Sequence, residues 1–432
     1  MTRKIETIPL IGNLKVEYYQ LQNGLRVAIV EDKTKPTFSF QTWFAVGSAD
    51  EDAGKQGLAH LFEHMMFRET TNLPLGEWEK IVNENGGTGI NAYTSRDQTV
   101  YYFSFPSEKF ETAVKLEADR MQNLIIDDNT FETEKGAVLT EKNRTLDDPN
   151  NYLWEQVYFH SYQNHPYKYS VIGETKTIKN FTSEEARDFY KKFYSPSNAL
   201  IIIVGDVKCD EALKIIEKYY GDYSNQPISE RLKIDEPERK ESKRLFFTHP
   251  KAKKKLYVVN WIAPHITDSD YPALTILSEV LAGSDSALLN ERLVFQSKVT
   301  QLYADMYEGR DGSTFEFFTQ LVDGVSFDEV WGIFHTTVCE IIEKGISPEQ
   351  LQIVKNNLEK YLYESVTSYS SLARLIGESF INTKDLSFYI NLIQNCNEVK
   401  VEDIKRVAKK YLIDSNSVAV SLSPTNSNGN KK

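Results

Sequence analysis

Two histidines and a glutamate in one short apolar segment have the types and spacing that metal chemistry needs. The segment Gly57–Phe67 contains His60-x-x-Glu63-His64. Histidines at positions i and i+4 of a helix lie one turn apart on one face, where their imidazoles can bind one tetrahedral zinc ion. Glu63 would lie on the adjacent face, within reach of a water molecule bound to that ion.

The order of these residues and their apolar neighbours favour a metal site over two ordinary helix histidines beside a surface glutamate. H-x-x-E-H is the inverse of H-E-x-x-H and is typical of inverted zincins. Leu58, Leu61, Phe62, Met65 and Met66 make the helix apolar. A buried carboxylate costs roughly several kcal/mol unless it is paired or faces a metal.

A third ligand is needed, because a catalytic zinc ion takes three protein ligands and leaves the fourth position to water. Glu134 and Glu141 lie on the predicted helix 131–144, seven residues and two turns apart, so they share a face. One can bind the metal and the other can support the ligands. Two glutamates on one helix are otherwise ordinary, and it is the upstream motif that makes them candidates.

The elements that must position these residues follow from the hydrophobic pattern. Apolar and aromatic runs predict strands, and amphipathic runs predict helices. The predicted strands are 25–30, 37–44, 99–105 and 199–204, and the predicted helices are 57–67, 107–123 and 129–145.

The two halves of the chain resemble each other. Lys191–Asn198 and Lys409–Asn416 each precede an apolar strand, 218 residues apart (416 − 198). We therefore predict an α+β protein with two homologous α/β-sandwich domains, each a mostly antiparallel sheet with helices on one face. The predicted parts are a catalytic domain at 1–229, a charged linker at 230–255, a homologous domain without metal ligands at 256–424, and a disordered tail at 425–432.

Composition and charge exclude several classes of function. The 432 residues are 41% hydrophobic and 26% charged, as in ordinary globular proteins. A net charge of −12 argues against binding to nucleic acid or to anionic membranes. Cys209, Cys339 and Cys396 are too few and too scattered for a disulfide framework or a thiolate zinc site. With no apolar leader after Met1, we expect a cytoplasmic protein, or a periplasmic one if a leader has been removed.

The motif and its distant glutamates resemble the pitrilysin/insulysin family, which includes mitochondrial processing peptidase. Glu141 follows His64 by 77 residues, with Glu134 seven residues earlier. Gly89-Ile-Asn-Ala-Tyr-Thr94 is similar to the family's G-x-x-N-A-x-T edge strand in its N-A-x-T part, and Ser195-Pro-Ser-Asn-Ala is similar to the family's domain-ending turn. These separate signals occur in the family's order along most of the chain.

The resemblance implies a zinc metalloendopeptidase that hydrolyses short or unfolded peptides in a closed chamber. His60, His64 and Glu141 would hold Zn²⁺, and Glu63 would be the general base. Glu134 would position the water or the ligands. Asn91 and Ala92, on the edge strand, would hold the peptide backbone by strand addition.

One stretch of the second half departs from the family pattern. Relatives carry S-R-L-x-x-x-L-R-E-x-x-x-x-A-Y, whose Arg and Tyr stabilise the tetrahedral intermediate. Here the Arg position falls on Val294 and the Tyr position near Thr300 or Gln301, although Arg292 and Tyr303 lie nearby. We therefore expect the zinc subunit of a heterodimer whose metal-free homologous partner supplies that pair. The alternatives are a homodimer, a non-catalytic core or scaffold subunit, and a subunit that captures peptides.

Overall fold

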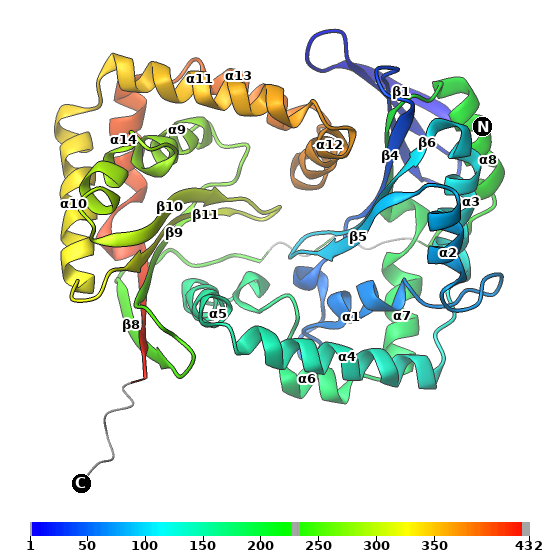
Figure 1. Ribbon diagram of the computed structural model, residues 1–432, viewed down its shortest axis with the longest axis horizontal. Helices are drawn as coiled ribbons and strands as arrows, with labels where there is room; N and C mark the ends of the chain where they lie inside the picture. Colours follow the sequence, from blue (N-terminus) through cyan, green and yellow to red (C-terminus); the bar gives the residue numbers. More distant parts are fainter. Residues whose placement is uncertain (1, 227–230, 232–233, 426–432) are drawn as a thin grey trace. The chain divides into compact units, whose positions relative to one another are not determined.

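The computed structural model describes residues 2–226, 231 and 234–425 (Figure 1). Parts of the predicted linker (230, 232 and 233) and nearly all of the predicted tail (426–432) lie outside the described residues. By its internal packing the chain divides into two compact units. Unit 1 comprises Met1–Lys142, Ser170–Leu232 and Tyr363–Ile390, and unit 2 comprises Asn143–Tyr169, Lys233–Leu362 and Asn391–Lys432.

Unit 1 is built on a seven-stranded sheet in the order β1-β2-β3-β7-β4-β6-β5. All neighbouring pairs are antiparallel except β3 and β7. Its strands are β1 (Arg3–Pro9), β2 (Lys15–Gln20), β3 (Arg26–Glu31), β4 (Thr37–Phe44), β5 (Thr88–Thr94), β6 (Thr99–Pro106) and β7 (Ala199–Gly205). Its helices are α1 (Leu58–Met65), α2 (Glu77–Glu84), α3 (Phe110–Asn123), most of α4 (Asp128–Leu146), α6 (Thr175–Asn180), α7 (Ser183–Phe193), α8 (Cys209–Tyr220) and α12 (Tyr369–Thr383).

Strand β7 explains why the most apolar run of the sequence is a central strand. Every residue of β7 is buried. Ile201 and Ile203 point into the cluster that also contains α1, α3 and α7. Leu200 and Ile202 point into a second cluster on the opposite face, formed with α12. A strand covered on both faces has no polar side, so it reads as a continuous apolar run.

Helix α12 comes from the second half of the chain and completes unit 1. Its Leu372, Ile376 and Phe380 pack in one cluster with Trp43 of β4. A Cβ atom added at Gly377 would lie 2.1 Å from the Trp43 ring, so only glycine allows this close approach. The prediction of helices on one face of the sheet is incomplete, since α12 covers the other face of this one.

Unit 2 repeats the core of unit 1. Its sheet has the order β10-β11-β9-β12-β8, with only β12 and β8 parallel. This order matches β5-β6-β4-β7-β3 of unit 1, strand for strand. The strands are β8 (Lys243–His249), β9 (Leu256–Ala263), β10 (Val299–Tyr307), β11 (Ser313–Leu321) and β12 (Ser417–Pro424). The helices are α5 (Pro149–Ser161), α9 (Tyr271–Ala282), α10 (Phe327–Lys344), most of α11 (Pro348–Ser365), most of α13 (Phe388–Cys396) and α14 (Val401–Tyr411).

The repeat confirms the predicted duplication of a mostly antiparallel α+β fold. α7 and α14 both have 11 residues and start 218 positions apart, as the matching sequence segments do. The division by packing differs from the predicted one, since 143–169 of the first half belong to unit 2 and 363–390 of the second half to unit 1. The prediction followed the repeat in the sequence, whereas packing assigns each segment to the core that it covers.

Strand β8 lies within the segment predicted as a charged linker, so that part of the segment is a strand rather than a connector. β8 is an edge strand, paired only with β12 among the described residues. Leu245 and Phe247 pack against the core of unit 2, whereas Phe246 between them is 72% exposed. The charge of the surrounding lysines and arginines hid this short alternation. None of the helices described here is long and apolar enough to cross a lipid bilayer.

Asp270, at the start of α9, links this helix to α14 of unit 2 by hydrogen bonds. Asp270 precedes α9 and is nearly fully buried. It accepts hydrogen bonds from Lys410 (2.8 Å), Tyr411 (2.9 Å) and Arg406, all on α14. Burial alone would raise the pKa of Asp270, but these three donors outweigh it and lower the pKa to about 2. The carboxylate therefore stabilises the folded state at neutral pH.

Asp270→Asn is expected to lower the free energy of unfolding at pH 7 by about 1–2 kcal/mol. This is less than the full pKa shift would give, because solvent screens the half-exposed Arg406 and Lys410. The folded pKa lies below the ordinary value near 3.8. The contribution is therefore complete above about pH 5 and is lost as the pH falls toward 2. Urea unfolding at pH 7 and pH 3 checks this, with exposed Asp285→Asn as control. A loss equal at both pH values would contradict the electrostatic origin.

Candidate metal centre

Helix α1 is held at its start by backbone geometry that only glycine fits. Gly57 has a φ of 102°, and a Cβ atom there would lie 2.5 Å from the carbonyl oxygen of Ile172. The carboxylate of Glu51 accepts hydrogen bonds from the N–H groups of Gly57 (2.9 Å) and Ala59 (2.7 Å). It thus satisfies two amides at the helix start that have no partner within the helix.

Helix α1 separates its apolar and polar residues. Leu58, Leu61, Phe62 and Met65 are at most 3% exposed and pack in the main core of unit 1. His60, Glu63 and His64 are half-buried. The helical period thus places the three motif residues together at the edge of the core, as their spacing predicted.

The two histidines and Glu141 of α4 converge on one point. His60 Nε2 lies 3.7 Å from Glu141 Oε1, and His64 Nε2 lies 3.3 Å from Glu141 Oε2. One ligand atom from each of the three residues lies within 4.8 Å of the others. Among the described residues, this is the one group of three or more His, Cys, Asp and Glu side chains close enough to share a metal ion.

The chemistry of this donor set fits zinc. Burial, with a smaller effect of His64, lowers the pKa of His60 to about 4, so its imidazole is neutral and can donate a lone pair at pH 7. Two imidazoles and one carboxylate are a typical ligand set of catalytic zinc, which leaves a position open for water. His60, His64 and Glu141 would therefore hold the ion.

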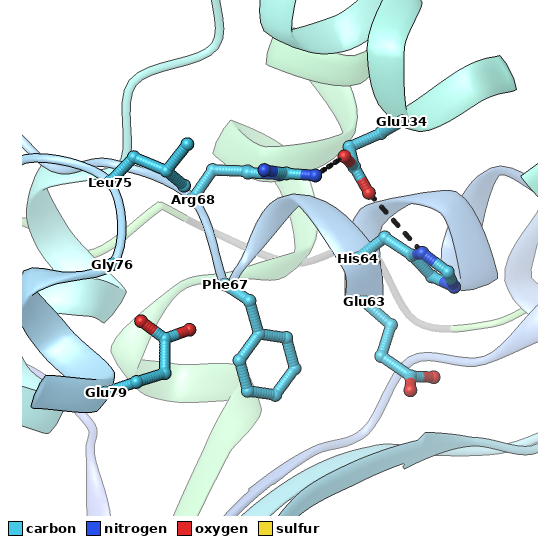
Figure 2. A pocket seen from close by; sticks show the side chains of 8 residues that line it. All are labelled: Glu63, His64, Phe67, Arg68, Leu75, Gly76, Glu79 and Glu134. Carbon is cyan, nitrogen blue, oxygen red and sulfur yellow. Dashed lines mark hydrogen bonds and ion pairs between the residues drawn. The ribbon is translucent and has the colours of Figure 1, made fainter. Parts of the chain in front are cut away.

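Glu134 lies two turns before Glu141 on α4 and contacts the same cluster. Its Oε2 atom lies 3.4 Å from His64 Nδ1, and its Oε1 atom accepts a hydrogen bond from the guanidinium of Arg68 (Figure 2). The Glu134 side chain is only 4% exposed. A carboxylate that holds the second ring nitrogen of a histidine fixes the orientation of its ring. This geometry fits the positioning role that the sequence suggested for Glu134.

Glu134→Gln is expected to weaken zinc affinity by about 10–100-fold while stoichiometric binding persists at saturating zinc, because the ligands remain but one loses its orientation. Competition with a chromophoric chelator measures this change. Glu132→Gln is the matched control, since Glu132 lies on the same helix but is exposed and paired with Lys135. An unchanged affinity in Glu134→Gln would contradict the supporting role.

Glu63 contacts the end of strand β5. Its Oε2 atom accepts a 2.5 Å hydrogen bond from Thr94 Oγ1 at the end of β5. Burial raises the pKa of Glu63, and the bond from Thr94 and the neighbouring His64 offset part of that rise. A half-buried carboxylate with a raised pKa, beside a metal site, has the properties of a general base.

Strand β5 is the last strand of its sheet, paired only with β6 among the described residues. Asn91 is exposed on it, and Ala92 is 9% exposed. The side-chain oxygen of Asn91 accepts a 2.9 Å hydrogen bond from the N–H of Ala92. The two residues predicted to bind substrate therefore lie on a free sheet edge, three and two residues from the Thr94 that contacts Glu63.

A pocket of about 460 Å³ opens beside Glu63 and His64 (Figure 2). Phe67 and Arg68 line it after the end of α1, and Glu134 lines it from α4. The remaining lining residues are Leu75, Gly76 and Glu79, at and near the start of α2. This pocket has room for a side chain next to Glu63 and His64.

Three supporting residues were missed by the sequence reasoning: Glu51, Arg68 and Thr94. Thr94 closes the N-A-x-T segment Asn91–Thr94, so its place in that motif was a signal, although its contact with Glu63 spans 31 residues. Arg68 follows His64 by four residues, but α1 has already ended there. Nothing in the local pattern marks Glu51 as the partner of the α1 amides.

Comparisons with known families agree with this geometry. The family model described as "Insulinase (Peptidase family M16)" matches residues 26–175. The model described as "Peptidase M16 inactive domain" matches residues 180–358. The chain belongs to peptidase family M16. This confirms the resemblance to the pitrilysin/insulysin group.

Relatives in family M16 match over nearly the whole chain. Zinc protease PqqE of Helicobacter pylori is 29% identical over 420 residues, which cover 95% of this chain and 93% of that protein. Mitochondrial-processing peptidase subunit beta of Lentinula edodes is 25% identical, covering 92% of this chain and 88% of that protein. The crystal structure of a protease from Helicobacter pylori superposes with a TM-score of 0.90 at 27% identity, covering 95% of this chain and all of that one.

Arg292 and Tyr303 lie near the stretch of the second half that departs from the family pattern, and both make contacts within the part matched by the M16 inactive-domain model or close to it in unit 2. Arg292, in a π-helical turn Asn290–Val294, bonds Thr337 Oγ1 (2.9 Å) and Glu340 (2.7 Å) on α10. The Tyr303 ring stacks on Phe318 at 4.9 Å and on Trp154 at 6.2 Å. Both side chains thus have partners inside unit 2.

Proposed function

We propose that this M16 chain is a zinc metalloendopeptidase that hydrolyses short or unfolded peptides in a closed chamber. The observation that carries the proposal is the convergence of His60, His64 and Glu141 within 4.8 Å. The Glu63 carboxylate lies on α1, the helix that carries both histidines. A scaffold has no need to keep half-buried ionisable groups in this arrangement, because their desolvation costs stability. Family membership and the zinc protease names of relatives support the same reaction class.

The chain's own residues divide the work of hydrolysis. Zinc, when bound, lowers the pKa of a coordinated water molecule and polarises the scissile carbonyl. The Glu63 carboxylate accepts the proton of the attacking water and returns it to the leaving amine. Thr94 holds Glu63 in place by its hydrogen bond. Asn91 and Ala92 on β5 bind the peptide main chain by strand addition, which tolerates many sequences.

We further propose that the active form is a heterodimer, in which a homologous metal-free subunit supplies an Arg/Tyr pair. Val294 stands at the Arg position, and Thr300 or Gln301 at the Tyr position. The engagement of Arg292 with Glu340 and the stacking of Tyr303 support the view that neither is free for the missing role. One relative is itself named as subunit beta of mitochondrial-processing peptidase.

The alternative functions are those of a core or scaffold subunit and of a peptide-capturing subunit, which would have the same fold but would not turn over peptides. The match of 180–358 to the M16 inactive-domain model is the observation that favours a core or peptide-capturing subunit. A homodimer is the alternative assembly.

For the compartment we propose the cytoplasm, because Cys209, Cys339 and Cys396 are free thiols. A structural neighbour titled periplasmic protease PqqL of Escherichia coli, 19% identical, keeps the periplasm open as the alternative.

Cleavage of a quenched fluorescent, unstructured peptide by the zinc-loaded chain tests these proposals together. We expect one zinc per chain and turnover that a chelator stops and zinc restores. Mixing with a metal-free homologue is expected to raise turnover by about 10²–10³-fold, the usual worth of one preorganised oxyanion donor. Full turnover by the chain alone would overturn the heterodimer. Zinc binding without turnover in either sample would favour the capturing subunit.

A further inference from the structure

The sheet of unit 2 ends at strand β8, where the sheet of unit 1 continues. In the repeated order of strands, β8 matches β3. β3 pairs with β7 on one side and, antiparallel, with β2 on the other. β8 pairs with β12 on one side, and no strand in the described part of the chain pairs with its other side (Figure 1). Unit 2 therefore has an open position where unit 1 has β2.

The side chains of β8 are those of a strand that lacks a neighbour. Leu245 and Phe247 pack against the core of unit 2. On the opposite face, Phe246 is 72% exposed, the largest value for any large apolar side chain described here, and Arg244 is exposed as well. In the matching strand β3, Val27–Val30 are all buried. An added strand would cover Phe246, because side chains pack against each other across a strand pair.

The charge around β8 is opposite to that of the whole chain. The chain has a net charge of −12, yet residues 239–255 contain eight lysines and arginines and one carboxylate, Glu241. Arg239 and Lys243 donate hydrogen bonds to main-chain oxygens at the end of α5 rather than to carboxylates. Lys240 and Arg244 are exposed beside them. This edge therefore attracts acidic groups and repels basic ones.

Edge geometry and charge together select the kind of occupant. The open side of a strand offers N–H and C=O groups that only another polypeptide backbone can pair with, which excludes nucleic acid. A second copy of this chain would bring the same basic edge, and lysines on an edge strand oppose such pairing. An extended peptide segment with carboxylate side chains matches both the backbone and the charge.

We propose that β8 binds an extended acidic segment of a partner protein, which adds to the unit 2 sheet as an antiparallel strand. It would take the position that β2 has beside β3. Its carboxylates would lie beside Lys240 and Arg244, and an apolar side chain would cover Phe246. Because β8 and the predicted substrate strand β5 belong to different sheets, this docking surface does not depend on the proposed peptidase function.

Two short peptides of identical composition and with capped ends test strand addition. One has valines and threonines in its N-terminal half and glutamates in its C-terminal half, and the other has the reverse order. In an antiparallel pair, the C-terminal half of the peptide lies beside the start of β8, where Lys243 and Arg244 are. Fluorescence anisotropy measures binding to the full, zinc-loaded Glu63→Gln chain, with an excess of a neutral unstructured peptide to compete for β5. Hydrogen exchange locates the amides that become protected.

We expect the peptide with C-terminal glutamates to bind about tenfold more tightly than its reverse, with new protection in β8. Phe246→Ala and Arg244→Glu should each weaken its binding about fivefold. The matched controls are Phe295→Ala, which removes another exposed phenylalanine of unit 2, and Lys409→Glu, which reverses an exposed charge on α14. Both controls should leave the affinity unchanged.

Several results would overturn the inference. Equal affinity for the two peptides would indicate attraction by charge without strand pairing. Protection outside β8, or an affinity that survives both Phe246→Ala and Arg244→Glu, would place the binding elsewhere. Absence of binding would mean that the basic side chains only protect the edge. A change in oligomeric state caused by Phe246→Ala, measured by sedimentation, would assign the edge to a second copy of this chain.

Discussion

Glu63→Gln is expected to lower kcat/KM for an unstructured peptide by about 10²–10⁴-fold while one zinc ion stays bound per chain. Glutamine can still accept the hydrogen bond from Thr94 Oγ1, so the local structure persists. It cannot accept the proton of the attacking water, and that loss alone removes the base. Steady-state kinetics together with metal analysis of the same sample measure both parts of the expectation.

The two readouts of Glu63→Gln separate the roles that a glutamate in this position can have. Loss of zinc from the variant would make Glu63 a ligand and contradict the assignment of Glu141 as the third one. Unchanged turnover would place the base elsewhere. Thr94→Val is an informative companion, because it keeps the carboxylate and removes only its hydrogen bond, so its effect should be much smaller.

His64→Ala is expected to lose both stoichiometric zinc and activity, down to the level of the chelator-treated protein. His64 lies 3.3 Å from Glu141 and 3.4 Å from Glu134, so its removal takes away one ligand and separates the supporting carboxylate from the metal. Two remaining protein ligands rarely hold catalytic zinc. Metal analysis after dialysis, combined with the peptide assay, measures the loss.

His335→Ala is the matched control for His64→Ala. His335 is exposed on α10 of unit 2, where it contacts Cys339 and Trp331. Its removal should leave zinc content and turnover unchanged. Retained stoichiometric zinc in His64→Ala would refute the ligand assignment, whereas zinc loss in both variants would point to general damage rather than to a lost ligand.

The parts of the site that obey a local period could be predicted from the sequence. Helical spacing places His60 beside His64, and it places Glu134 and Glu141 on one face of α4, where both contact His64. The contacts of Arg68 with Glu134 and of Thr94 with Glu63 join residues 66 and 31 positions apart. Such contacts depend on how helices and strands pack, and no local pattern encodes them.

The fold could be predicted to a similar depth. Apolar runs predicted β4 and β7 closely, and the repeated turn predicted the duplication. The place of α12 was not predicted, because its amphipathic pattern shows that it needs an apolar surface but not which one. β8 was missed because a strand at a sheet edge keeps one polar face, and charged neighbours mask a short alternation.

The membership of α12 in unit 1 has a consequence for biosynthesis. A ribosome that has completed residue 229 has made every strand of the seven-stranded sheet, yet the surface of Trp43, Leu200 and Ile202 still lacks its cover. At about 5–20 residues per second, the covering helix emerges roughly 10–30 seconds later. During that interval a nascent chain exposes an aggregation-prone apolar surface, a natural target for chaperones. A gene truncated after the first half would leave that surface exposed permanently.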